Sequence, residues 1–254
     1  VFNYTEHKGS PWDRPKMSKT TALTLTEGVD MASPQGITDT AVTVTPLEVG
    51  VQTVLTDRMV SRAPSGFDLM VAADMSLAWK EKMDTDLLGL FSGLSLGLSA
   101  AGSALTLPNT GAGMARVKGN AEPGPAPYYL VLHPYAAWDI MAAITPVAGN
   151  TSSNAIEGVS QDVIRSANLG RLWGTQLPVF ESGLISIDAS DDAYGAVFSK
   201  ECFMLMIVDE GSMRHQRDES ARWDELTYVG EYGFAEWVDS FGYYFLTDVL
   251  APTA

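Results

Sequence analysis

One group of residues in the chain has the pattern of a catalytic site. Gly93-Leu-Ser-Leu-Gly97 fits G-x-S-x-G, the pattern of a serine nucleophile elbow, and Asp188 and His215 follow in the chain order that such a hydrolase uses. An elbow needs a strand before the serine and a helix after it. Here a long helix is predicted before Ser95 and a Gly/Ser loop after it. We therefore interpret the match as a chance occurrence and predict no catalytic residue.

The histidine and cysteine residues form no pattern that would bind a metal. His7, His133 and His215 are far apart, without H-x-x-x-H or H-E-x-x-H spacing. His133 ends an apolar segment before a proline, which favours a strand-end residue over a catalytic base. Cys202, the single cysteine, lies in a strongly apolar segment and is interpreted as a core residue of a buried strand.

Three acidic residues give the remaining candidate for a metal site. Asp188, Asp191 and Asp192 could hold a cation through oxygen ligands, although a solvated turn is the favoured interpretation. The chain contains no phosphate-binding loop and no dinucleotide fingerprint. The sequence therefore predicts no metal and no cofactor.

Composition narrows the class of protein. With 254 residues and 46% hydrophobic content, the chain can bury a large core, as one domain or as two that interrupt each other. Its net charge of −15 argues against a general nucleic-acid-binding protein, because phosphate contacts need clustered Lys and Arg. No apolar run approaches the roughly 20 residues that span a bilayer, so a soluble protein without membrane contact is expected.

The stretch from Thr21 to Leu94 organises the rest of the chain. Segments 21–29 and 41–57 alternate apolar and polar residues, the pattern of half-buried strands, and the connection between them contains turn residues. These features predict a hairpin with arms at 21–29 and 41–57. Pro46 removes a backbone donor, so the second arm is predicted to be an edge strand or to bend there.

A long amphipathic helix is predicted from about residue 67 to residue 91. Ser65 is expected to cap it, with Asp68 three residues later. At about 1.5 Å per residue the helix would be roughly 37 Å long. Its apolar stripe has spacings of three and four, and consists of Val71, Met75, Trp79, Met83, Leu87, Leu90 and Leu94.

The remaining segments predict an α+β protein, because strands and helices are segregated rather than alternating. Residues 1–20 are predicted as an extended basic arm without regular strand, whose aromatic residues dock against another surface, such as a second subunit. The other predicted elements are a flexible small-residue segment at 92–104, a loop at 107–113, a weak helix at 114–118, a strand at 128–133, a helix at 134–144, a polar loop at 149–154, a helix at 159–168, a turn and strand within 169–183, and strands at 184–188, 195–199, 203–208, 226–232 and 235–245.

Several segments in this order resemble one protein family. They are Thr24-Leu-Thr-Glu-Gly-Val-Asp-Met-Ala32, the run from Ile37 through Pro46 to Asp57, Lys82-Met-Asp-Thr-Asp-Leu-Leu88, Leu130-Val-Leu-His-Pro134 and, more loosely, 174–185. Together they resemble the major capsid proteins of tailed bacteriophages. The resemblance covers about residues 20 to 250 and implies the Hong Kong ninety-seven type of capsid fold.

That resemblance implies a division of the chain into an N-terminal arm, an extended β-hairpin loop, a peripheral domain with a long spine helix, and an axial domain. The expected boundaries are 1–20 for the arm, 21–57 for the extended loop, 58–128 for the peripheral domain, 129–225 for the axial domain and 226–254 for the return to the peripheral domain.

It also implies a function. The expected protein is a non-enzymatic shell subunit of a virion, assembled in the host bacterial cytoplasm as pentamers and hexamers around packaged double-stranded DNA, which it does not bind sequence-specifically. Portal and scaffolding proteins are expected partners, and a cement protein is a further one. The alternatives are an encapsulin-like compartment, which shares the fold but encloses cargo enzymes, and, third, a hydrolase that uses Ser95.

In the family the extended loop lies over an adjacent subunit. Some relatives join subunits through an isopeptide bond from a lysine on this loop, but no lysine occurs here between Lys19 and Lys80, so a non-covalent shell is predicted. The residues expected to contact the neighbouring subunit are Trp12, Glu27, Val29, Met31, Ile37, Val42 and Val44.

Overall fold

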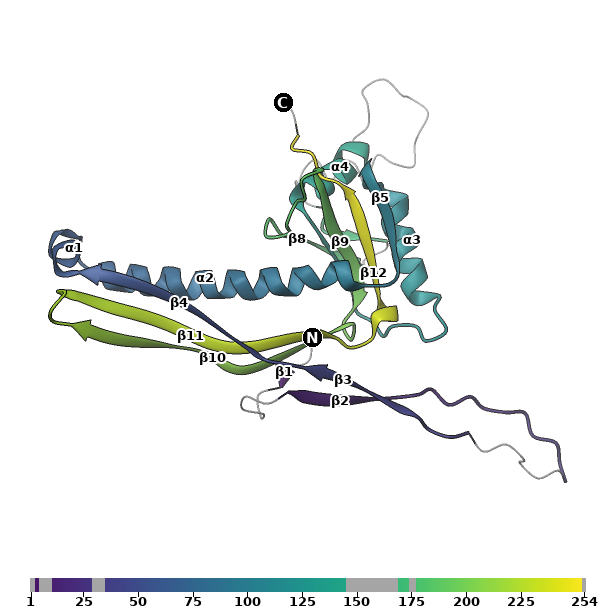
Figure 1. The fold of residues 1–254 in the computed structure, drawn as a ribbon. Helices are drawn as coiled ribbons and strands as arrows, with labels where there is room; N and C mark the ends of the chain where they lie inside the picture. Colours follow the sequence, from purple (N-terminus) through teal and green to yellow (C-terminus); the bar gives the residue numbers. More distant parts are fainter. Residues whose placement is uncertain (1–2, 5–10, 29–34, 145–168, 174–176, 253–254) are drawn as a thin grey trace, which may run out of the picture.

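The structure is a computed structural model that describes residues 3–4, 11–28, 35–144, 169–173 and 177–252. A long helix, α2 (Phe67–Gly89), lies along a narrow sheet, and a second sheet with its own helices forms a compact body at the C-terminal end of α2 (Figure 1). A β-hairpin projects away from the narrow sheet in the direction opposite to the N-terminal end of α2. The molecule is elongated, and it is α+β, as the sequence predicts.

The narrow sheet has four strands in the order β1 (Asn3–Tyr4), β10 (Phe203–Asp218), β11 (Trp223–Glu236) and β4 (Leu47–Thr56). β10 and β11 form a long antiparallel hairpin that extends well beyond the strands predicted at 203–208 and 226–232. β4 pairs with β11 along its whole length and is the edge strand. Pro46 lies immediately before β4, which agrees with the prediction that this proline marks an edge strand or a bend.

α2 lies on this sheet through the predicted stripe. Met75 and Trp79 are buried, and Met75 packs with Leu55 of β4 and Leu226 of β11. The helix begins after Gly66, whose φ of 86° is a left-handed conformation, and no side chain caps it, so the predicted cap by Ser65 is wrong. A non-glycine residue would be strained at this φ, which explains why position 66 is a glycine.

The C-terminal half of α2 is attached by polar contacts as well. Lys82 pairs with Asp86 one turn later on the same helix. The Tyr232 hydroxyl of β11 donates to Asp86 Oδ2 at 2.8 Å. A short helical turn, η1 (Leu90–Gly93), follows α2 and brings Phe91 into the second body.

The second sheet has six strands in the order β5 (Gly97–Ala104), β12 (Gly242–Asp248), β9 (Asp192–Ser199), β6 (Tyr128–Leu132), β8 (Leu177–Glu181) and β7 (Arg171–Leu172). Helices α3 (Leu107–Lys118) and α4 (Pro134–Ile144) pack against it, and Leu130, Ile140 and Phe245 are among the buried residues of their shared core. The strand predicted at 128–133 and the helix at 134–144 are confirmed.

Two predictions of irregular structure are wrong. The small-residue segment after residue 92 contains strand β5, which pairs in parallel with β12. A Cβ on Gly97 would clash with the Tyr244 ring, so close packing explains the small residue. The loop predicted at 107–113 is the first half of α3, where a Cβ on Gly113 would come within 2.5 Å of Phe245.

Four strand predictions are also corrected. Residues 12–17, within the arm predicted to lack strand, form β2 (Trp12–Met17). The segment 184–188 makes only an isolated bridge between Ile187 and Ala193. The strand predicted at 235–245 is interrupted by the helical turn η2 (Asp239–Phe241), and Cys202 lies just before β10 instead of inside it. The loop at 149–154 and the helix at 159–168 lie outside the described residues.

Candidate assembly surfaces

The projecting hairpin is formed by β2 and β3 (Asp39–Val44). Trp12 pairs with Val44 and Met17 with Asp39, so the partner predicted for the second arm, residues 21–29, is wrong. β2 and β3 form a sheet of two strands in the described part of the chain. A two-stranded hairpin is marginally stable in water, so it needs a further surface to lie on.

The base of the hairpin finds that surface within its own subunit. Val44 is 0% exposed and packs with Met204 and Met206 of β10, while Trp12 and Val42 are half-buried against the same cluster. The guanidinium of Arg14 lies 4.2 Å from the centre of a Trp237 ring system, a cation–π contact. These contacts fix the direction in which the hairpin leaves the body.

The distal part has no such cover among the described residues. The Ser18 amide donates to the Thr38 carbonyl at 2.8 Å, and the Gln35 amide group bonds to the backbone of Thr21, so the two sides stay together beyond the strands. Every described residue from 18 to 28 and from 35 to 38 is exposed. Apolar side chains here have high exposed fractions, Leu23 51%, Leu25 63% and Ile37 66%, and so does Met17 at the end of β2, with 71%.

The residues predicted to contact a neighbour therefore separate into groups. Trp12, Val42 and Val44 belong to the hairpin base and are brought together in the subunit's own core cluster. Glu27 and Ile37 are exposed on the distal part. Val29 and Met31 lie outside the described residues.

Three exposed apolar residues of the hairpin were missed by the sequence prediction. They are Met17, Leu23 and Leu25. The alternation of Leu and Thr from residue 21 to residue 26 was a signal for two of them, since it places Leu23 and Leu25 on one face of an extended segment. The prediction omits Leu23 and Leu25 because it places that segment in a paired arm.

A second exposed apolar surface lies at the opposite end of the molecule, where helix α1 (Asp57–Arg62) turns into α2. Met59 and Val60 of α1 and Leu69 of α2 are exposed. Met59 also lines an open hollow of about 510 Å³, together with Thr56, Arg58, Arg62, Ala63, Pro64 and Phe67. The lining thus combines two arginines with apolar side chains, on a chain that is acidic overall.

The position of α1 depends on Arg217 near the tip of the β10–β11 hairpin. Its guanidinium bonds to both carboxylate oxygens of Asp57, at 2.5 and 2.9 Å, and to Asp224 at 3.1 Å. The hydrogen bonds from Arg217 lower the pKa of Asp57. The Thr56 hydroxyl accepts from the Met59 amide at 3.3 Å and caps α1.

The three residues of the possible hydrolase are not brought together. The Ser95 amide donates to Asp239 Oδ1 at 2.7 Å, and its hydroxyl also bonds to Asp239. The Asp188 carboxylate accepts backbone N–H groups within its own turn, and His215 Nε2 lies 3.0 Å from Asp224 Oδ1 on the β10–β11 hairpin. Each of the three is occupied by a different structural contact, so no triad forms.

The other candidate chemical groups have structural partners too. Burial raises the pKa of the Cys202 thiol, which favours the unreactive protonated form. His133 is buried, its Nδ1 accepts from the Tyr135 amide at 3.2 Å, and burial lowers its pKa. In the described ranges, no three His, Cys, Asp or Glu side chains are arranged to hold a metal, Asp188, Asp191 and Asp192 included.

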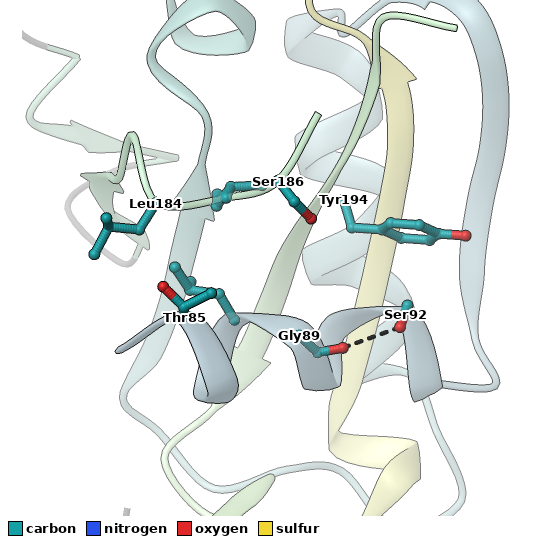
Figure 2. A pocket seen from close by; sticks show the side chains of 8 residues that line it. Thr85, Gly89, Ser92, Leu184, Ser186 and Tyr194 are labelled. Carbon is teal, nitrogen blue, oxygen red and sulfur yellow. Dashed lines mark hydrogen bonds between the residues drawn. The ribbon is translucent and has the colours of Figure 1, made fainter. Parts of the chain in front are cut away.

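A cavity of about 250 Å³ lies where α2 meets the second sheet. Figure 2 shows Thr85, Gly89 and Ser92 on one side of it, and Leu184, Ser186 and Tyr194 on the other. Its lining has hydroxyl, leucine and isoleucine side chains, without His, Lys or carboxylate groups for acid–base catalysis. No described helix has both the length and the apolar character to cross a membrane.

No protein-family model and no curated protein sequence matches the chain. Among solved structures it is similar to the head structure of Helicobacter pylori bacteriophage KHP40, with a TM-score of 0.76 and 11% identity over 98% of this chain and 88% of that one. A structure from Mycobacterium phage Che8 matches with a TM-score of 0.71 and 16% identity over 94% and 85%.

An encapsulin complex from Synechococcus elongatus also matches, with a TM-score of 0.63 and 11% identity over 99% of this chain and 87% of that one. These phage structures thus match at higher TM-scores than the encapsulin. The chain has the fold of phage capsid proteins, with a long helix on a narrow sheet, a projecting hairpin and a second α+β body.

Proposed function

We propose that this chain is the major capsid protein of a tailed bacteriophage, a non-enzymatic subunit that self-assembles into an icosahedral shell. The observation that carries the proposal is the likeness to a phage head structure over 98% of the chain. The structure adds a physical reason for self-assembly. Exposed apolar side chains lie on the distal hairpin, and the described residues place no cover over them.

The two apolar surfaces suit a head-to-tail contact between copies. The distal hairpin and the α1–α2 corner lie at opposite ends of the molecule (Figure 1), so the hairpin of one subunit can lie on the corner of the next. Glu27 on the hairpin complements Arg58 and Arg62 at the corner. Head-to-tail contacts close into rings when the rotation per subunit is an integral fraction of a turn. Pentamers and hexamers are such rings.

In this proposal the virion shell is held by contacts rather than covalent bonds. The chain has no lysine between Lys19 and Lys80, so the hairpin lacks the amine that an isopeptide bond needs. Mature particles should therefore run as a single monomer band on a denaturing gel. A ladder of covalent oligomers would contradict the non-covalent shell.

The proposal includes further partners. The shell encloses double-stranded DNA and does not bind it sequence-specifically. A chain of net charge −15 has no general electrostatic attraction to the phosphates of that DNA. Portal and scaffolding proteins, a cement protein and assembly in the host cytoplasm belong to the same proposal. So does the division into an arm (1–20), an extended loop (21–57), a peripheral domain (58–128 and 226–254) and an axial domain (129–225).

An encapsulin-like compartment is the second candidate, and the similarity to the encapsulin complex favours it. The two functions differ in what the shell contains. Particles purified from the native source should protect DNA of genome length from nuclease if the phage function is right. Particles that contain protein cargo without such DNA would support the compartment instead.

Self-assembly itself is tested by a double substitution on the distal hairpin, Leu25→Asp with Ile37→Asp. Both side chains are exposed in the subunit, so thermal unfolding of the unassembled chain should be unchanged. Under conditions in which the unchanged chain sediments as large particles, the variant should stay unassembled. Leu250→Asp, another exposed leucine that lies away from the hairpin, is the matched control. Assembly of the hairpin variant at the control level would contradict the proposed contact.

A further inference from the structure

The outward face of α2 carries a regular seam of side chains. The sheet covers the opposite face, which contains the buried Met75 and Trp79. The outward seam has spacings of four and three and consists of Met70, Asp74, Leu77, Glu81, Asp84 and Leu88. Met70 and Leu77 are 64% and 54% exposed. The alternation of four and three repeats every seven residues, which is the pattern of the contact line of a second helix packed alongside.

The seam alternates apolar and acidic residues. Asp74, Glu81 and Asp84 are exposed, and no ion pair joins any of them to a cation among the described residues. Lys80, an exposed cation on the same helix, also forms no ion pair among the described residues. The face therefore has an excess of negative charge beside two exposed apolar side chains.

The seam ends at the cavity between α2 and the second sheet. Thr85, Leu88 and Gly89 of α2 line the cavity, and Leu184 and Tyr194 lie across from them (Figure 2). Leu88 is half-buried there, whereas Met70 at the other end of the seam is exposed. At about 1.5 Å per residue, the distance along the helix from Met70 to Leu88 is about 27 Å.

We propose that this face binds a basic amphipathic helix of another protein chain. The partner helix has about 18 to 20 residues, which is the length of the seam at about 1.5 Å per residue. Its contact line presents apolar residues to Met70 and Leu77 and Lys or Arg to Asp74, Glu81 and Asp84. An apolar residue near one end enters the cavity beside Leu88.

The charge of the face selects this occupant over two others. Nucleic acid is disfavoured because its phosphates would meet three carboxylates. The distal hairpin of a second copy is also disfavoured, since its described residues carry only Lys19 and Glu27 and thus no net positive charge. A helix that combines an apolar stripe with basic flanks satisfies both the apolar and the acidic positions of the seam.

The proposal is independent of shell assembly and is tested with a synthetic peptide on the full, unassembled chain. The probe is a fluorescent, end-capped helical peptide of about 20 residues, with Leu opposite Met70, Leu77 and Leu88 and Lys opposite the three acidic positions. The reference peptide has the same composition in scrambled order. Binding is measured by fluorescence anisotropy at several salt concentrations, with light scattering to confirm that the chain stays unassembled.

We expect saturable binding of the amphipathic peptide and at least tenfold weaker binding of the scrambled one. Met70→Ser with Leu77→Ser should weaken binding at least tenfold, whereas Met213→Ser with Leu250→Ser, at exposed positions away from α2, should leave it unchanged. Glu81→Gln with Asp84→Asn should weaken binding and reduce its salt dependence. Glu48→Gln with Glu210→Gln, also exposed, is the matched charge control.

Three results would overturn the proposal. One is equal affinity for the two peptides, and another is equal affinity of the seam variant and its control. The third is self-association of the unchanged chain that the Met70/Leu77 variant abolishes, since a second copy would then be the occupant. Shell assembly that proceeds normally in a variant without peptide binding would leave the proposed capsid function intact.

Discussion

Trp79 is the side chain on which the attachment of α2 to its sheet depends most. Its indole is 4% exposed and lies between two rings of β11, edge-on to Tyr228 at 5.9 Å and to Tyr232 at 5.5 Å. The indole packs directly over Gly230, where a Cβ would come within 2.6 Å of the ring. Replacing Trp79 with alanine removes this contact from the middle of the helix.

The expected loss follows from the buried area. An indole buries about 150–250 Å², which at about 25 cal/mol per Å² corresponds to about 4–6 kcal/mol. Alanine and partial collapse of the site recover some of this, so Trp79→Ala should lower the free energy of unfolding by about 4 kcal/mol. A domain is stable by about 5–15 kcal/mol in total, so the variant should be close to unfolding.

The assay is urea unfolding of the unassembled chain, followed by circular dichroism and by tryptophan fluorescence to test for two-state behaviour. Leu77→Ala on the exposed face of the same helix is the control, with an expected change within about 0.5 kcal/mol. A loss below about 1 kcal/mol for Trp79→Ala, or equal losses for the two variants, would refute this explanation of helix attachment, since such small changes are typical of surface sites.

Gly230 gives an independent check of the same contact. Gly230→Ala should destabilise the chain by about 1–3 kcal/mol because the added methyl group overpacks the site. Most of this cost should disappear in a Trp79→Ala background, where the indole no longer opposes the methyl group. An unchanged cost would show that the clash is with the Asp209 carbonyl oxygen, which lies 3.0 Å from the position that the added methyl group would take.

Two pH-dependent effects are expected, both measured by thermal melts of unassembled chain. Arg217 lowers the pKa of Asp57 below its ordinary 3.8. Arg217→Gln should therefore lower the stability of the chain at pH 5, whereas the control Arg214→Gln should not, and this loss should vanish as the pH falls well below 3.8. A loss of stability that persists at low pH would contradict this. Burial and Asp239 raise the pKa of Glu236 above 4.5. Its ionised form is therefore destabilising, so Glu236→Gln should stabilise the chain at pH 7 and have no effect below pH 4.5; a destabilised variant at pH 7 would contradict this.

The helix α2 could be predicted from the sequence because its information is local. Spacings of three and four place Met75 and Trp79 on one face, and that face is buried. The predicted start at about residue 67 is confirmed, but the way the helix is capped could not be predicted, since the φ of 86° at Gly66 results from the chain path and has no side-chain signal.

The strand β5 could not be predicted, because its small residues are explained by packing against distant parts of the chain and not by a local strand preference. Gly97 and the small residues after it have little intrinsic preference for strand. They form one because β12 offers a partner much later in the chain, with the Tyr244 ring directly against Gly97. A pairing at such a separation leaves no periodic signal in the local sequence.

In the projecting hairpin too, the strand pairing could not be predicted from the local sequence. Alternation correctly marks the segment around Val42 and Val44 as strand, but it does not identify the partner. The partner is β2, which contains Pro15, a residue type that disfavours strand. Proline is tolerated there because, among the described residues, no further strand pairs with the outer edges of this two-stranded hairpin. The exposed contact residues were therefore only partly identified.

A cryo-electron microscopy map of particles assembled from this chain is the decisive measurement for hairpin-mediated shell assembly. We expect closed shells in which the distal hairpin of each subunit, with Leu25 and Ile37, lies against the α1–α2 corner of its neighbour near Arg58 and Arg62. Chains that remain dispersed under all assembly conditions, or shells in which the hairpin contacts only its own subunit, would contradict the proposed function and its contact.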